Sequence, residues 1–176
     1  YKRQIHHLLF DETDIKNYRT FFKLRPPLRS NSDKLFLLQN IKDSTLDTIS
    51  SFHLPQDEES KRLPFERAAF GAIGLQTLLP ACLKLVNDKI IDLPQLFRKI
   101  SLNPAKILNI KSGILEEGYF ADLVLFDPYK PLLIDRFSLL SKAKNTPFDG
   151  YQLFGKVLKT FVGGEEIYKS GNINDT

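Results

Sequence analysis

The N-terminal half of the chain alternates between helical and strand-like spacings of apolar residues. Leu46–Ser51 has the composition of a short buried strand, and Pro55, which cannot donate to a β-ladder, must lie beyond its end. Asp33–Lys42, just before it, has a partly apolar face and Ser32 as a candidate N-cap. A helix followed by a strand is typical of an α/β unit, in which chemistry is placed in the loop after the strand.

That loop is poor in groups that can carry out chemistry. It contains Phe52, His53 and Gln56, of which only the histidine is a residue type common in acid–base catalysis. One imidazole beside a phenylalanine is a meagre set for a catalytic site. Function is therefore expected at this loop, with an incomplete set of catalytic groups.

The strongest helical pattern covers Leu75–Val86. Its apolar residues recur at spacings of three and four, at Leu75, Leu78, Leu79, Cys82, Leu83 and Val86. Because Cys82 belongs to this stripe, a buried and unreactive thiol is favoured over a nucleophile. Pro80 predicts either a kink or a junction between two segments.

Two shorter helices are expected further along the chain. Asp92 can cap a helix over Leu93–Ile100. Asn103, followed by a proline at the first helical position, can cap another helix that runs to Ile110. Gly113 ends this helical region.

After the glycine at position 113 the apolar pattern changes to the alternation that is typical of strands. Ala121–Asp127 is expected to be a strand that the following proline stops, and Leu132–Ile134 a weaker one. Lys156–Val162 and Glu165–Tyr168, separated by two glycines, are predicted to form a hairpin. The pattern thus places α/β material before this boundary and β material after it.

The start of the chain is predicted to be extended. A strand over Tyr1–Phe10 places His6 and His7 on opposite faces, so that they do not easily share a metal ion and are better interpreted as packed and hydrogen-bonded. Phe21–Leu24 is a second short candidate strand, and Asp57–Pro64 is expected to be a charged loop.

Two local features each leave two interpretations open. Arg25 and Arg29 flank a pair of prolines that hold the backbone extended, so they either grip an anion or lie separately on the surface. In the segment Phe70–Gly74, the glycines allow close backbone approach, either to a ligand or to another part of the chain.

Composition narrows the function classes. The 176 residues are 42% hydrophobic, and no apolar run is long enough to span a membrane. The net charge is +4, but opposite charges are interspersed, which favours solvated faces over a nucleic-acid surface. One cysteine excludes an internal disulfide and fits a reducing, cytoplasmic compartment. The chain starts at Tyr1 and contains no methionine, so we expect a fragment or a processed chain.

Several motifs, taken in order, resemble those of class I dihydroorotases, which belong to the amidohydrolase superfamily. The resemblance runs through nearly the whole chain and covers only the last part of a typical family member. It rests on Ile5–Leu9, Pro26–Arg29, Leu46–Pro55, Pro64–Glu66, Phe70–Gly71, Asn103–Ala105, Gly118–Leu123, Ser141–Gly150, Gly155–Val157 and Val162–Gly164.

The resemblance implies an α/β fold, namely the C-terminal portion of an amidohydrolase (β/α)8 TIM-like barrel followed by strands of a small β-sandwich. Residues 1–112 are then expected in the barrel, residues 113–169 in the composite sandwich with its return segment, and residues 170–176 in a frayed tail. The family closes carbamoyl-aspartate to dihydroorotate reversibly in pyrimidine biosynthesis. Zinc activates a water in the hydrolytic direction, and an aspartate after the last barrel strand moves the proton.

The catalytic groups of the family have no counterpart in this chain. Phe52 occupies the position of the catalytic aspartate, directly before His53. The resemblance places the zinc ligands upstream of Tyr1, so no metal ligand and no cofactor are expected here. His6 and His7 match a family pair that does not bind the metal.

The substrate contacts are only partly retained. Arg25 stands where the family has a substrate-binding asparagine, and Gln56 where it has a substrate-binding histidine. Phe70 and Gly71, whose backbone borders the substrate in the family, are unchanged. These four positions are the candidate substrate-binding residues.

Two functions from different classes are consistent with this pattern. One is a non-catalytic dihydroorotase-like protein with a structural or assembly role, for which the family implies aspartate carbamoyltransferase as a partner. The other is an active zinc-dependent cyclic amidohydrolase that uses His53 or an upstream residue as its base. Whether the protein is an enzyme is left open at this stage.

The partial barrel also implies a partner of its own. Sheet edges and apolar helix faces are expected to be exposed, so the missing N-terminal segment present as a second chain, or self-association, is predicted to cover them. No nucleic acid and no membrane is expected as a partner.

Overall fold

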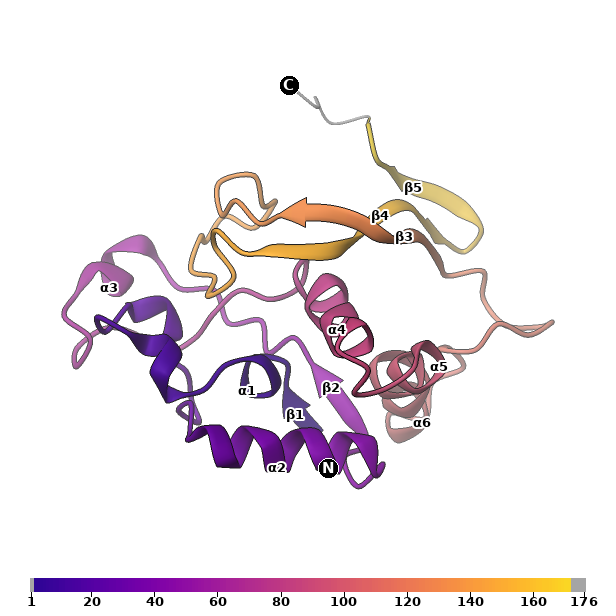
Figure 1. The fold of residues 1–176 in the computed structure, drawn as a ribbon. Coiled ribbons are helices and arrows are strands. Elements are labelled where there is room, and N and C mark those ends of the chain that lie inside the picture. The colour runs from indigo at the N-terminus through magenta and orange to yellow at the C-terminus, as the bar shows by residue number, and fades with distance from the viewer. Residues whose placement is uncertain (1, 172–176) are drawn as a thin grey trace.

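The structure is a computed structural model that describes residues 2–171 (Figure 1). All described helices precede a three-stranded antiparallel sheet. The strands are β1 (Lys2–Gln4), β2 (Thr48–Ser50), β3 (Leu123–Leu133), β4 (Gln152–Val162) and β5 (Glu165–Lys169). The helices are α1 (His6–Leu9), η1 (Glu12–Ile15), η2 (Thr20–Phe22), α2 (Asn31–Lys42), α3 (Glu58–Arg62), α4 (Leu78–Asn87), α5 (Leu93–Phe97), η3 (Arg98–Leu102) and α6 (Asn103–Ile107). Within this part of the chain, no helix is both long and apolar enough to cross a membrane.

A short parallel strand pair positions the predicted functional loop. β1 and β2 pair in the register Arg3 with Ile49, and α2 connects them along the chain, so the predicted helix–strand unit is confirmed. The helix cap lies two residues earlier than predicted. Ser30, and not Ser32, accepts a hydrogen bond from the backbone N–H of Asp33 at 3.3 Å.

The start of the chain forms less strand than the apolar pattern predicted. Only residues 2–4 form a strand, and His6 and His7 lie in the helical turn α1, so their placement on opposite faces of a strand was wrong. The segment predicted as a strand at 21–24 begins in the 3-10 helix η2. The charged loop predicted at 57–64 contains the short helix α3, because Asp57 accepts from the backbone N–H of Ser60 and caps it.

The strong helical pattern corresponds to α4, which begins three residues later than predicted. Pro80 therefore lies in the first helical turn, where its missing N–H costs no helical hydrogen bond, and it produces no kink. Cys82 is fully buried in the core, as predicted, and burial raises the pKa of its thiol. The apolar core around α4 also includes Ile5, Leu24 and Phe148.

The next two predicted helices are joined. Asp92 caps α5 through a hydrogen bond from the N–H of Gln95 at 2.7 Å, which confirms that prediction. The chain then continues through the π-helical turn η3 into α6, so Asn103 has helical backbone angles and is not an N-cap. Its side-chain amide instead donates to Asp47 O at 2.8 Å.

The C-terminal sheet runs in the order β3–β4–β5. The predicted hairpin with a two-glycine turn is confirmed. β3 does not stop before Pro128, because irregularities in the register after Leu125 and between Asp127 and Pro131 accommodate the proline. Of the predicted frayed tail, residues 172–176 lie outside the described residues.

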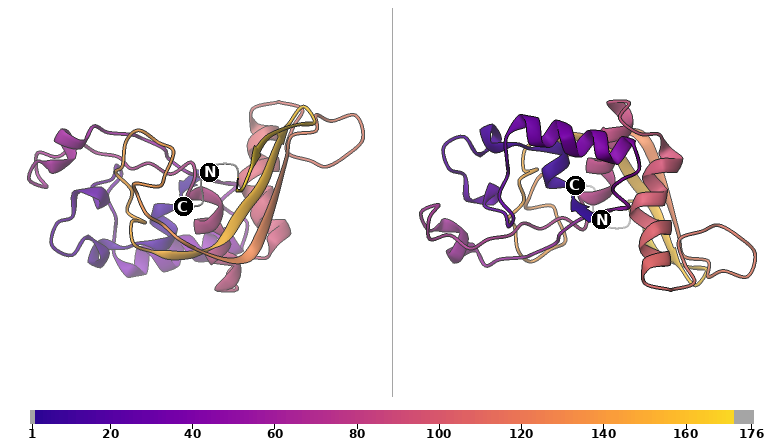
Figure 2. Two further views of the ribbon diagram at one scale, coloured as in Figure 1. Left: turned by 90° about the horizontal axis from the view of Figure 1, so that it is seen from above. Right: turned by 90° about the horizontal axis from the view of Figure 1, so that it is seen from below.

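The sheet lies against α4, as Figures 1 and 2 show from different directions. Gly155 makes this contact close. Its backbone has φ 105°, and a Cβ at this position would collide with Leu83 on α4. A glycine in β4 therefore allows the sheet to pack on the helix that carries the core.

Candidate functional site

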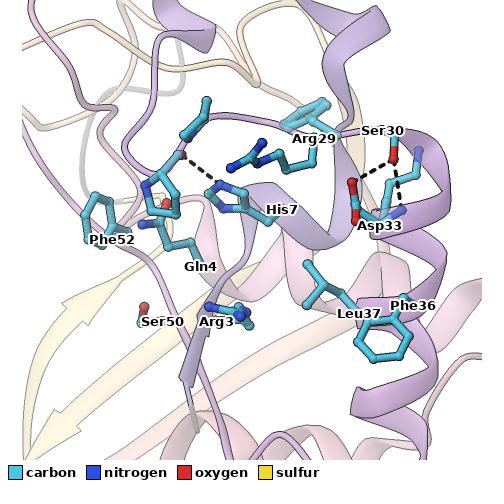
Figure 3. A pocket seen from close by; sticks show the side chains of 14 residues that line it. Arg3, Gln4, His7, Arg29, Ser30, Asp33, Phe36, Leu37, Ser50 and Phe52 are labelled. Atoms are coloured by element: carbon cyan, nitrogen blue, oxygen red, sulfur yellow. Dashed lines mark hydrogen bonds between the residues drawn. The ribbon is translucent and has the colours of Figure 1, made fainter.

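Phe52 stands where the chain leaves the carboxyl end of β2. Its φ of 45° lies in the left-handed region, which asparagine and aspartate tolerate and bulky side chains rarely adopt. The half-buried side chain lines a cavity of about 470 Å³ between β1 and α2 (Figure 3). A phenyl ring therefore occupies the position after β2 at which the family resemblance implies a carboxylate.

The described residues around this cavity place no carboxylate beside Phe52. Asp33 is the only acid among them, and its Oδ2 accepts a hydrogen bond from Ser30 Oγ at 2.7 Å at the start of α2. Figure 3 shows Asp33 on the opposite side of the cavity from Phe52. Arg3 and Arg29 are exposed cations on its wall. The cavity can attract an anion, but its only carboxylate lies away from Phe52.

Two buried polar side chains complete the wall. Gln4 Nε2 donates to Arg25 O at 3.1 Å, and His7 Nε2 donates to Pro26 O at 2.9 Å. Because a carbonyl only accepts, His7 Nε2 carries the proton and Nδ1 is an acceptor in the neutral ring. Burial lowers the pKa of His7, which favours that neutral form. Gln4 Oε1 and His7 Nδ1 have no partner among the described residues.

His53 is fixed in the wrong tautomer for a base that acts through Nε2. The backbone N–H of Gly74 donates to His53 Nδ1 at 3.1 Å, so Nδ1 must present a lone pair. In the neutral ring the proton is therefore on Nε2, the nitrogen that remains for another partner. His53 borders a separate cavity of about 320 Å³ and does not line the one next to Phe52.

Arg25 and Phe70, both singled out from the sequence, do lie together. The Arg25 guanidinium is 5.7 Å from the centre of the Phe70 ring, and Lys23 Nζ is 4.6 Å from it. The backbone of Gly71 is also close, because its N–H donates to Lys23 O at 3.0 Å. Two positively charged side chains therefore lie against the same aromatic ring. Their charge differs from the neutral amide that the resemblance implies for position 25.

The two glycines of this segment contact the loop after β2. A Cβ at Gly71 would lie 2.8 Å from Leu54 O, and a Cβ at Gly74 would collide with Ser51 O. A bridge between His53 and Ala72 continues the same contact. These glycines therefore allow close packing against another part of the chain, which was one of the two interpretations left open by the sequence.

Asn145, which the sequence analysis included only as part of a motif, fastens this loop. It is 2% exposed, and its amide donates to Leu54 O at 3.3 Å and to Gly71 O at 3.1 Å. Its Oδ1 accepts from the N–H of Gln56 at 3.3 Å, and its backbone oxygen accepts from Ile73. No spacing rule identifies such a residue, because its partners are backbone groups far away in the sequence.

Lys61 is a second brace that the sequence analysis did not find. Its ammonium group donates to Ala69 O at 2.8 Å and to Gly71 O at 3.0 Å. Burial and the nearby charge of Lys23 lower the pKa of Lys61 to about 8. In the sequence this lysine belongs to a charged run that gives no sign of burial.

Gln56 lies apart from the other candidates. It lines a cavity of about 740 Å³ that includes Arg19 and Arg136, and it does not border the cavity next to Phe52. The structure therefore divides the sequence-derived positions into the Phe52 cavity, the Arg25–Phe70 contact and the Gln56 cavity.

The two adjacent histidines are part of the packing. His6 is fully buried and its ring centre lies 5.6 Å from that of Phe148. Burial, with the neighbouring His7, lowers the pKa of His6 to about 3. Across residues 2–171, no three His, Cys, Asp or Glu side chains are grouped so that they could hold a metal ion. The described residues by themselves therefore do not fit a zinc ion.

The fold and the sequence together define the class of this protein. The model of the amidohydrolase family matches residues 66–167, and the chain belongs to this family. In structure it is similar to the L-hydantoinase (dihydropyrimidinase) from Arthrobacter aurescens, with a TM-score of 0.91 and 28% identity, over 97% of this chain and 39% of that chain. It corresponds to the C-terminal portion of the barrel and the strands that follow.

Within the family, dihydroorotases are among its similar relatives. It is 41% identical to the dihydroorotase of Syntrophus aciditrophicus over 93% of this chain and 38% of that protein. It is 37% identical to the dihydroorotase of Ehrlichia canis over 93% of this chain and 36% of that protein. The chain therefore spans less than two-fifths of the length of these relatives. The expected resemblance to dihydroorotases is confirmed.

Proposed function

We propose that this protein is a non-catalytic dihydroorotase-like protein of pyrimidine biosynthesis with a role in assembly. The observation that carries the proposal is the backbone at Phe52. Its left-handed conformation suits aspartate or asparagine, and a phenylalanine there costs about 1 kcal/mol or more. The loop thus keeps the shape that suits a carboxylate-bearing residue while the carboxylate itself is absent.

The adjacent histidine does not replace it. A base must present a lone pair toward the proton that it removes, and His53 uses its Nδ1 lone pair to accept from Gly74. Taking a proton at Nε2 requires the tautomer with a proton on Nδ1, which breaks this hydrogen bond. The loss of a general base typically costs about 10² to 10⁴ in rate.

Exposed apolar surface supports the assembly role. Large apolar side chains are exposed on β3 and on the segment before it, including Leu115, Phe120, Val124 and Leu125. Such surface favours contact with another chain or with the N-terminal segment that the partial barrel lacks, so it supports an assembly role for the part that this segment leaves uncovered. The partner we expect is aspartate carbamoyltransferase, and a zinc ion, if the native protein holds one, needs ligands beyond the described residues.

Turnover measurements on three versions of the native protein test the proposal. Zinc content and dihydroorotate hydrolysis are measured for wild type, for Phe52→Asp and for Phe52→Asn, which matches the shape of aspartate without its proton chemistry. We expect wild type and Phe52→Asn to be inert. Turnover that appears only in Phe52→Asp identifies the lost group, and zinc-dependent turnover by wild type contradicts the proposal.

Co-purification tests the assembly role separately. Tagged wild-type protein is purified from its own host, and the sample is probed for aspartate carbamoyltransferase. We expect a stable complex that Phe52→Asp leaves intact, because the substitution changes the site and not the surface. Recovery of the protein without the carbamoyltransferase contradicts this part of the proposal.

A further inference from the structure

The cavity that Gln56 borders is lined by many charged side chains. It lies between η2, the loop leading into α3, and the connection from β3 to β4, and its volume is about 740 Å³. Six cationic and three acidic side chains line it, so it carries an excess of positive charge. An anion that enters it gains from this excess.

Two arginines of this cavity are held in place by the same two groups, Asp149 and Phe21. Arg19 Nη2 donates to Asp149 Oδ2 at 2.7 Å, and Arg136 Nε lies 3.9 Å from the same oxygen. Both guanidinium groups lie over the Phe21 ring, at 4.9 and 5.3 Å from its centre, and that of Arg136 also lies 4.5 Å from the Phe137 ring. Stacking and a shared carboxylate restrict both side chains, which reduces the entropy lost when a ligand binds.

One carboxylate does not neutralise this pair. Asp149 Oδ1 is already occupied by the backbone N–H of Arg136 at 3.1 Å, which leaves Oδ2 for both guanidinium groups. Each guanidinium carries several N–H donors, and the described interactions use few of them. Lys142, which lines the same cavity, makes no hydrogen bond or ion pair with another described residue. Unused donors of three cations therefore border one cavity.

We propose that this cavity, the Arg19–Arg136 cavity, binds a small phosphorylated ligand. A guanidinium donates two parallel hydrogen bonds to a phosphate, and a pair of fixed guanidinium groups with a nearby ammonium matches a group with more than one negative charge. The cavity is larger than a phosphate needs and lies in the range of small-molecule sites. Phe137, which is 66% exposed, provides apolar surface for the organic part of the ligand. The proposal does not depend on whether the protein turns over dihydroorotate.

Calorimetric titration of the native protein with pyrophosphate tests the proposal. We expect saturable binding that weakens as salt is added, because screening reduces the attraction. Arg136→Gln and Lys142→Gln should each weaken binding, by about tenfold for the arginine and by about threefold for the lysine. Lys84→Gln is the matched control, because Lys84 pairs with Asp88 on α4 and does not line the cavity, and it should leave the affinity unchanged.

The design separates loss of binding from loss of folding. Lys142 has no described partner to lose, so Lys142→Gln should keep the wild-type melting temperature even if Arg136→Gln does not. The proposal is overturned if pyrophosphate shows no saturable binding, or if both cavity variants bind it as wild type does. Citrate, a polyanion without phosphate, should bind more weakly, and equal affinity for citrate overturns the assignment to phosphate.

Discussion

Residues 145–149 hold both the Phe52 loop and the Arg19–Arg136 cavity in place, but they do so through different kinds of contact. Asn145 ties the loop to the segment around Gly71 through its amide, and Asp149 holds two arginines at the cavity. At the loop the braces contact backbone atoms, so they persist whatever side chain stands at position 52. At the cavity Asp149 contacts the side chains of Arg19 and Arg136, so this contact is lost if either arginine is replaced. A scaffold held by backbone contacts can therefore keep its shape after its catalytic group has been replaced.

The largest effect is expected from removing the backbone brace. Asn145→Leu removes the side-chain hydrogen bonds to Leu54 O, Gly71 O and the Gln56 N–H, and only Gly71 O keeps another donor, Lys61. The variant should lower the free energy of unfolding by about 4 kcal/mol. Chemical denaturation measures it, with Asn87→Ala at the exposed end of α4 as the control, for which a change below about 0.5 kcal/mol is expected. Equal effects of the two variants contradict the role given to Asn145.

The second largest effect is expected on the free energy of unfolding when the pH is lowered. The pKa of His6 is about 3 in the folded chain and about 6.5 when unfolded, so between these values the unfolded state binds more protons. Stability is therefore full above pH 6.5 and should fall by about 1.4 kcal/mol per pH unit below it, or by about 3 kcal/mol between pH 6.5 and 4. The lowered pKa of His7 adds to the same trend.

His6→Leu isolates this contribution. The variant cannot take up a proton at this position, so its stability should vary less with pH between 6.5 and 4 than that of wild type. Urea denaturation at several pH values measures the difference. If both proteins show the same pH profile, His6 is not the buried neutral imidazole described above.

A smaller effect is expected at Phe52 itself. Phe52→Asn loses apolar contacts in the cavity but relieves the left-handed backbone, so the free energy of unfolding should change by less than about 1 kcal/mol. Phe52→Ala loses the contacts without that relief and should be less stable than the asparagine variant by about 1 kcal/mol. If the alanine variant is the more stable of the two, the backbone at this position does not favour asparagine.

The smallest effect is expected at the rim of the Arg19–Arg136 cavity. Arg62 and Glu58 form an ion pair at 2.7 Å along α3, with both side chains largely exposed. Arg62→Gln should change the free energy of unfolding by less than about 0.5 kcal/mol, because exposed ion pairs contribute little. Thermal denaturation checks this, and a loss of several degrees shows that the rim is more rigid than its exposure indicates.

Periodicity identified the elements whose sequence signals are local. The stripe that contains Cys82 became α4, and the paired glycines became the turn between β4 and β5. Errors arose where tertiary contacts decided the outcome. β3 passes Pro128 because its partner β4 tolerates an irregular register, and α1 replaces a predicted strand because His6 packs against Phe148.

The sequence named candidate residues for the site but not the contacts that hold them. The sequence indicated the loop at Phe52 and the proximity of Arg25 and Phe70 to it in the family. It contained no sign that Asn145 and Lys61 brace that loop, since their partners are backbone oxygens far away in sequence. It also placed Gln56 with the other candidates, whereas the structure places Gln56 in a different cavity.

Turnover by the assembled wild-type protein distinguishes a non-catalytic protein from an enzyme. The native protein, with zinc supplied and with the proposed partner, aspartate carbamoyltransferase, present, is mixed with an equal concentration of dihydroorotate, and carbamoyl-aspartate is followed over hours. We expect product to form no faster than in buffer with zinc and the carbamoyltransferase alone, because Phe52 cannot move a proton and His53 presents Nε2–H. Product that forms faster than this background, scales with the amount of this protein and disappears when zinc is removed contradicts it.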